Sequence, residues 1–346
     1  MTRAVLAGGP ASLTLTDAAS TPQTIFLLDD SRLALDRVSS VITSALYGDG
    51  DEVGTDFMVK GSGTPMLYQP TTTARALFPF STVSGSTLSI LPQIGRSIFG
   101  TTFGAVTAGQ TDCTALWASP NGDTFLVANY GISKPPDINL GTNKPIFGPI
   151  EIVGIISTAA GAAGFFDPNV ANAYYTTGTA GFSYLALDTT HLGRGSYTAT
   201  WAGKNITSSQ TQDGFQITHE YKVEARQAYG GLTCDMILVS WRVMCKFIPV
   251  GGNATMANIQ TDAAMGGSTG SVQGRRLGQT AADLTLTGAS GGSDLSPVVV
   301  LKGAMMKTAG FVFGNKPLRN GELGFVSTWG AAGPAGTTNP VLMTLT

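Results

Sequence analysis

The chain is poor in charged residues. Lys, Arg, Asp and Glu make up 12% of its 346 residues, half of the ~25% typical of soluble proteins. Monomers normally cover their surface with charge, so we expect other subunits to cover part of this one. The formal net charge is −2, and the only adjacent basic pair is Arg275-Arg276. Phosphate binding needs clustered Lys and Arg, so the composition argues against specific nucleic-acid recognition.

Histidine and cysteine are scarce too. The two histidines, His191 and His219, lie far apart, and Cys113, Cys234 and Cys245 have no metal-ligand spacing. Catalytic triads and many zinc sites depend on His, so we expect no metal site. His219 alternates with neighbours in a strand pattern beside Glu220 and is expected at a surface or an interface. The thiols are expected to be free and buried.

The sequence also contains no serine in the sequence context of a catalytic nucleophile. Two Gly-x-Ser-x-Gly patterns, at 266–270 and 288–292, lie in Gly/Ser-rich stretches rather than between a strand and a helix, and no His follows either one. We expect loops there, no catalytic residues, no cofactor and no enzymatic activity.

Long apolar runs are missing as well. No run approaches 18 residues, so no membrane helix is predicted and no membrane partner is expected. The stretch 1–10 has no h-region of a secretory signal, and with three cysteines of no metal-type spacing we expect the protein to be made in a reducing compartment.

What the chain does have is short apolar segments rich in Val, Ile, Thr, Phe and Tyr and separated by Gly, Pro, Asn or Asp. Such segments indicate β-strands, so we predict a mainly β fold with few short helices. Two stretches are compatible with a helix, 32–46 and 254–265, and the first favours a strand in part.

One segment occurs twice. The first copy starts at Trp117-Ala118 and the second at Trp201-Ala202, and each continues through a turn, an alternating strand and a longer apolar strand. This predicts two tandem β-sandwich or half-barrel domains, at 1–158 and 181–346, joined by a Gly/Ala-rich linker at 159–180. The identities are few, and a chance match stays open.

Further echoes link the halves in a different order. Ala11–Thr16 resembles Ala282–Thr287, and Asn143-Lys144-Pro145 resembles Asn315-Lys316-Pro317. Either the halves exchange strands or some echoes are accidental, and the sequence leaves both possibilities open.

Several segments together resemble a known family, the major tail (tail tube) proteins of long-tailed, siphovirus-like bacteriophages. The resemblance covers roughly 76–157 and 197–330, through short apolar and turn motifs: Ala76–Pro79, Ile98–Gly100, Gly122–Phe125, Ile132–Leu140, Ile146–Ile150, Asp213–Phe215, Glu220–Lys222, Leu232–Pro249 and Leu318–Glu322.

The resemblance implies a structural virion protein, made in the host bacterium and located in the phage tail. Its domains are expected to contribute strands to an intersubunit β-barrel around a channel, in stacked rings that DNA crosses without specific binding during ejection. A chain with two such domains implies trimeric rings with pseudo-sixfold symmetry. Partners would be further copies of the chain and the tape measure, tail terminator and baseplate proteins.

A lumen that DNA crosses is expected to be neutral or acidic, because a basic wall would hold phosphates. The most acidic stretch is 29–56, and we expect some of its carboxylates in the lumen; a solvated loop or a ring-to-ring contact stays open. It contains Asp29, Asp30, Asp36, Asp49, Asp51, Glu52 and Asp56 against Arg32 and Arg37.

Two other functions remain open from the sequence. A capsid or decoration protein would be favoured by a long helix, and a carbohydrate-binding tail spike by a strict short repeat or a cleft with paired carboxylates.

Overall fold

The protein is almost entirely β, as the sequence predicts. The computed structural model describes residues 11–16, 22–28, 30–43, 50–66, 75–78, 81–85, 87–90, 94–99, 114–120, 122–128, 130–141, 145–155, 175–176, 197–201, 204–205, 214–227, 233–248, 282–288, 298–312, 319–327 and 341–344. Within these ranges the helical content is a single turn at 75–77. The stretch 32–46 is a strand as far as Thr43, whereas 254–265 lies outside the described residues.

The first half of the chain contributes two antiparallel sheets. One has the order β13-β9-β8-β1-β2-β5, made of Tyr175–Thr176, Thr124–Ala128, Thr114–Ala118, Ala11–Thr16, Pro22–Leu27 and Pro65–Met66. The other has the order β10-β12-β4-β3, made of Tyr130–Lys134, Ile150–Ile155, Gly50–Gly63 and Arg32–Thr43.

Trp117 packs between these two sheets. Its ring, on β8, lies against the glycine Gly61 of β4, where an added Cβ would come within 2.5 Å of Trp117 Cζ2. The missing side chain therefore lets the indole approach the backbone of the facing sheet.

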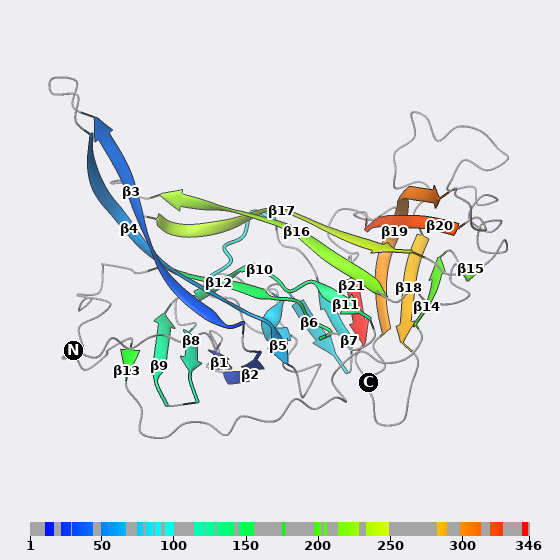
Figure 1. Ribbon diagram of the computed structural model, residues 1–346, viewed down its shortest axis with the longest axis horizontal. Helices are drawn as coiled ribbons and strands as arrows, with labels where there is room; N and C mark the ends of the chain where they lie inside the picture. The colour runs from blue at the N-terminus through cyan, green and yellow to red at the C-terminus, as the bar shows by residue number, and fades with distance from the viewer. Residues whose placement is uncertain are drawn as a thin grey trace.

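The second half forms most of an 11-stranded sheet that also takes strands from the first half (Figure 1). Its main path is β11-β16-β17-β20-β19-β18-β14-β15, made of Ile138–Leu140, Phe215–Gln227, Thr233–Phe247, Arg319–Ser327, Val298–Val312, Ala282–Gly288, Tyr197–Trp201 and Lys204–Asn205. Off this path, β21 (Val341–Thr344) pairs with β19 and with β7 (Thr87–Ile90), which pairs with β6 (Ser81–Ser84).

The two halves repeat the same strand arrangement with the chain order permuted. In the first half the paths are β9-β8-β1-β2 and β10-β12-β4-β3; in the second they are β15-β14-β18-β19 and β16-β17-β20-β19. Strand β19 takes the places of both β2 and β3, with Gly303 at φ 55° between its two parts. The first half runs through β1–β4 before β8–β12, and the second runs through the equivalents in the opposite order.

The Trp-Ala units and the echo of Ala11–Thr16 in Ala282–Thr287 both belong to this repeat. Leu13 pairs with Trp117, and Leu284, its counterpart in the second echo, pairs with Trp201. Trp201 packs edge-on against Phe325 of β20, at a centroid distance of 5.4 Å, as Trp117 packs on β4. The Asn-Lys-Pro echo falls between β11 and β12 in the first half and between β19 and β20 in the second, which are not equivalent connections, and most of its residues lie outside the described ones.

The halves also share strands across the predicted linker. Strands β6 and β7 join the second half through β21, and β11 pairs with β16. Of the linker 159–180 the structure describes Tyr175–Thr176, which pairs with β9. The boundaries at 158 and 181 themselves stay a prediction.

Strand β11 continues β10 beyond a break at Lys134-Pro135-Pro136-Asp137. Beyond this break, β11 pairs with residues 146–148, which directly precede β12. Two main-chain hydrogen bonds, Asn139 N to Ile146 O and Gly148 N to Asp137 O, both 2.7 Å, make this pairing. The other side of β11 pairs with β16, with Ile138 opposite Ile217. The main-chain pairing thus runs through eight strands, β3-β4-β12-β10/β11-β16-β17-β20-β19.

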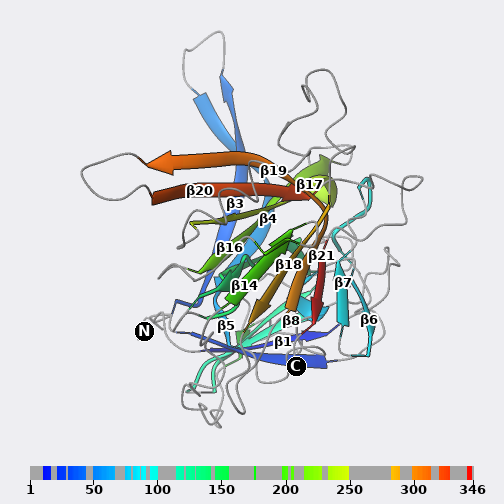
Figure 2. The ribbon, with the colours of Figure 1, turned by 90° about the vertical axis from the view of Figure 1, so that its right-hand side faces the viewer.

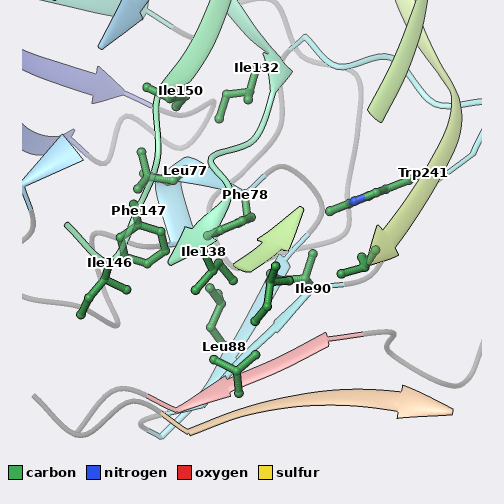
Figure 3. Packing of buried hydrophobic residues seen from close by; sticks show 14 of the residues in the cluster. Leu77, Phe78, Leu88, Ile90, Ile132, Ile138, Ile146, Phe147, Ile150 and Trp241 are labelled. Atoms are coloured by element: carbon green, nitrogen blue, oxygen red, sulfur yellow. The ribbon is translucent and has the colours of Figure 1, made fainter. Parts of the chain in front are cut away.

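The core around this junction draws on both halves (Figure 3). Phe78, Ile138 and Phe147 come from the first half and Trp241 from the second, with Leu88 and Ile90 of β7 beside them. All are buried. The halves therefore do not have separate cores.

Gly214 is expected to be essential for this junction. Its φ is +66°, and a Cβ there would lie 2.0 Å from the Leu140 carbonyl oxygen, so Gly214→Ala adds a clash to backbone strain. Gly85 is the matched control, because its φ is +58° and nothing lies within 4 Å of its added Cβ. Urea unfolding should show a loss about 2 kcal/mol larger for Gly214→Ala than for Gly85→Ala. Equal losses would contradict the close approach.

Candidate assembly surface

The eight-stranded path ends in two open edges. Among the described residues, β3 pairs along its whole length with β4 alone, and the part of β19 from Met305 to Val312 pairs with β20 alone. Figure 1 shows β3 and β19 at opposite ends of the molecule, and β3 and β4 extend beyond the rest of the chain. An open edge presents unpaired main-chain N–H and C=O groups, which readily pair with another chain.

Strand direction makes the two edges compatible. Every neighbouring pair along the eight-stranded path is antiparallel, so β3 and β19 run in opposite directions. If β19 of one copy lies beside β3 of the next, that pair is antiparallel too. The alternation then continues without a break around a closed ring.

Strands β16 and β17 have one buried and one exposed face. Phe215, Ile217 and His219 point into the core, whereas Gln216, Glu220 and Lys222 are exposed. On β17, Trp241, Val243 and Cys245 are buried, and Arg242 and Lys246 are exposed. This alternation is typical of an antiparallel sheet with one face in water.

The exposed face of β16, β17 and β20 holds three ion pairs. Glu220 lies 3.5 Å from Arg242 across the strands, Lys222 lies 2.7 Å from Glu224, and Lys246 lies 3.2 Å from Glu322. All six side chains are about half exposed or more, from 49% to 64%.

Some polar side chains of β3 and β12 in the first half are exposed as well. Arg32 and Glu151 are exposed, and Arg32 Nε donates to Ser62 Oγ at 3.2 Å. Lys134 stands opposite Glu151 in the register of β10 and β12.

His219 does not lie at a surface or an interface, as the sequence suggested, but in the core. Its Nδ1 accepts a hydrogen bond of 2.9 Å from Trp241 Nε1, and its ring packs against Phe78 at a centroid distance of 5.7 Å. Burial, together with the positive charge of Lys134, lowers the pKa of His219 to about 3. Its place in the run Phe215, Ile217, His219 was the available signal, since those positions alternate with polar ones.

The other predicted residues are placed only in part. Asp30 is exposed, and its carboxylate accepts hydrogen bonds from Thr64 N and Thr64 Oγ1 at 2.9 and 2.5 Å. Whether it faces a channel stays a prediction. Asp29 and Asp49 lie outside the described residues. Asp36, Asp51, Glu52 and Asp56 belong to β3 and β4, whose distal side chains the structure does not describe.

The candidate chemical groups are not assembled into a reactive site in the part of the chain that is described. Cys245 is a buried free thiol whose pKa burial raises. His191, Cys113 and the segment 266–270 lie outside the described residues, as does nearly all of 288–292. No group of three or more His, Cys, Asp or Glu gathers among the described residues.

Among the helical residues that the structure describes, none forms a helix long and apolar enough to span a membrane.

Comparisons with known proteins do not assign the chain to a family. No family model matches the chain, and no curated protein matches it. Among solved structures it is similar to Hcp1 from Flavobacterium johnsoniae, with 12% identity over 39% of this chain and 90% of that one. The TM-score is 0.22, which is too low to support an argument about either fold or function.

Because His219 is buried and neutral, we expect the free energy of unfolding to decrease in mild acid. Above pH 6.5 the imidazole is neutral in both states and has no effect. Between pH 6.5 and about 3, His219 is protonated in the unfolded chain but stays neutral in the folded chain. The free energy of unfolding therefore decreases as the pH is lowered through this range. From pH 7 to pH 5 the loss from this residue is about 2 kcal/mol.

Urea unfolding at pH 7 and pH 5 measures this loss, and His219→Gln is the comparison because Gln does not titrate. The variant is less stable at pH 7 but should lose about 2 kcal/mol less on acidification. Parallel losses in the two proteins would show that His219 is not held neutral.

Proposed function

We propose that this protein is a structural protein that assembles through its sheet edges into closed rings, and that stacked rings form the tail tube of a long-tailed bacteriophage. The observation that carries the ring is that β3 and β19 run in opposite directions at the two ends of the eight-stranded path, and that each has a side without a strand partner among the described residues. The phage tail comes from the sequence resemblance.

Ring closure removes both exposed edges. When β19 of one copy pairs with β3 of the next, each copy uses two different surfaces, and such head-to-tail contacts close into rings when the rotation per copy permits. In the closed ring no edge remains to pair with other chains. The protein's few charges and many Gly and Thr residues suit close contacts of this kind.

The exposed face of the sheet belongs on the inside of that ring. The opposite face is covered by a further layer, for example by β8 with Trp117 and by β14 with Trp201. A covering layer needs more circumference than the sheet it covers, so it fits at the larger radius. The face with Glu220, Arg242 and Lys246 then lines the channel.

The number of strands favours three copies. Two copies supply about 16 strands, the size of porins whose channels pass small solutes. Three supply about 24, and at ~4.8 Å spacing and ~40° tilt the backbone diameter is on the order of 45–50 Å. That leaves room for a DNA duplex after side chains narrow the channel.

In this function the partners are further copies of the chain, within and between rings, and the tape measure, tail terminator and baseplate proteins at the tube ends. The protein would be made in the bacterial cytoplasm and remain in the virion. DNA would pass through the channel without specific binding. Nothing in the described residues favours the capsid, decoration or tail-spike alternatives over this one.

Electron microscopy of the purified full chain tests the proposal. Rings or tubes with a central channel, with a three-copy mass by light scattering, are expected. Closed shells, or compact oligomers without a channel, would overturn it.

A shortened β3–β4 hairpin tests the edge directly. Placing Asn-Gly between Arg37 and Phe57, which stand opposite each other, removes the distal rungs and keeps those from Arg32 to Arg37. We expect a folded chain with an unchanged circular dichroism spectrum that no longer forms rings.

The control is the same replacement at the tip of β16–β17, with Asn-Gly between the opposed residues Arg226 and Asp235. This hairpin lies inside the path rather than at its end, so ring formation should persist. Rings from the shortened β3–β4 variant would show that β3 is not the joining edge.

A further inference from the structure

Three basic side chains of β16 and β17 lie beside carboxylates. Arg242 has Glu220, Lys222 has Glu224 and Lys246 has Glu322, each within 3.5 Å. The three pairs occupy one exposed face of neighbouring strands in a chain with only 12% charged residues. Such a concentration of paired charge on one face calls for a physical reason.

Stability is an insufficient reason. Exposed ion pairs typically contribute about 0–1 kcal/mol, because water screens them and two long side chains must be ordered. All six side chains here are half exposed or more. Removing one carboxylate should therefore cost little folding energy.

The pairs have a larger effect on how the face interacts with polyanions. Each Lys or Arg that contacts a phosphate releases a counterion and strengthens binding to DNA, whatever the sequence. A carboxylate beside the cation competes with phosphate for it, and at distances larger than the separation of the pair it cancels the field of the cation. Salt screens what remains of that field over about 8–10 Å. Three carboxylates thus remove three possible phosphate contacts.

We propose that Glu220, Glu224 and Glu322 neutralise Arg242, Lys222 and Lys246 so that this face does not bind DNA phosphates. The proposal rests on the proposed function, in which the face lines a DNA channel, and it adds the device that keeps the wall from holding its cargo. Neutrality comes from pairing charges side by side rather than from an acidic wall.

The test is DNA binding by the purified full chain, measured by fluorescence anisotropy with a short labelled duplex at 50 to 200 mM salt. The wild type should not bind measurably. The triple variant Glu220→Gln, Glu224→Gln and Glu322→Gln should bind, with log K falling against log salt with a slope of about −3. The absence of binding by the folded triple variant would overturn the proposal, as would tight binding by the wild type.

Two controls separate local pairing from net charge. Asp283→Asn raises the net charge by the same amount as Glu322→Gln, but its partner Lys302, at 2.6 Å, belongs to the β18–β19 layer. Glu322→Gln should strengthen DNA binding and Asp283→Asn should not; equal gains would contradict the assignment. Exchanging the charges, Glu220→Arg with Arg242→Glu, keeps the pair and should leave the chain unable to bind DNA.

The outcome is independent of ring formation. The DNA assay is made on the unassembled fraction of the purified chain, whereas electron microscopy detects assembly. If the chain forms no rings but the triple variant binds DNA and the wild type does not, only the proposed function is wrong. Rings from a triple variant that still does not bind DNA would defeat the neutralisation alone.

Discussion

The short pairing of β11 with β16 is the contact on which the rest of the structure depends. Three residues of each strand join the sheets of the two halves, and the Asp137 carboxylate accepts a hydrogen bond of 3.0 Å from His219 N where the prolines interrupt the strand. Gly214 lets the start of β16 come close to the Leu140 carbonyl. Without this junction, β3 and β19 would not be the two ends of one path of paired strands. Figure 2 looks from the β19 end of the molecule, with β19 and β20 towards the viewer and β3 and β4 behind them.

The permuted repeat explains why the two ends of the eight-stranded path are equivalent strands that run in opposite directions. Since β19 takes the place of β3 in the second unit, the two outer edges are equivalent strands running in opposite directions. Such ends are complementary for antiparallel pairing. A ring built from them would therefore use the same main-chain hydrogen bonding that holds the interior of the sheet together.

Burial and charge divide the faces of β16 and β17 between two tasks. The buried face brings Trp241, Phe78 and His219 into contact, and this packing keeps the imidazole neutral. The exposed face pairs its charges instead of burying apolar side chains. A face with this composition suits water or a passing polar chain better than a permanent apolar partner.

The sequence by itself determined the strand content and the repeat of the Trp-Ala units, because alternation and turn residues act locally. It could not order the echoes Ala11–Thr16 and Ala282–Thr287, since pairing partners far apart in the chain depend on tertiary packing. It also misplaced His219, because a strand pattern does not say which face is covered. The tertiary structure decided the shared core, the permuted order, the joined sheet and the two edges left open, since each depends on main-chain pairing between distant segments.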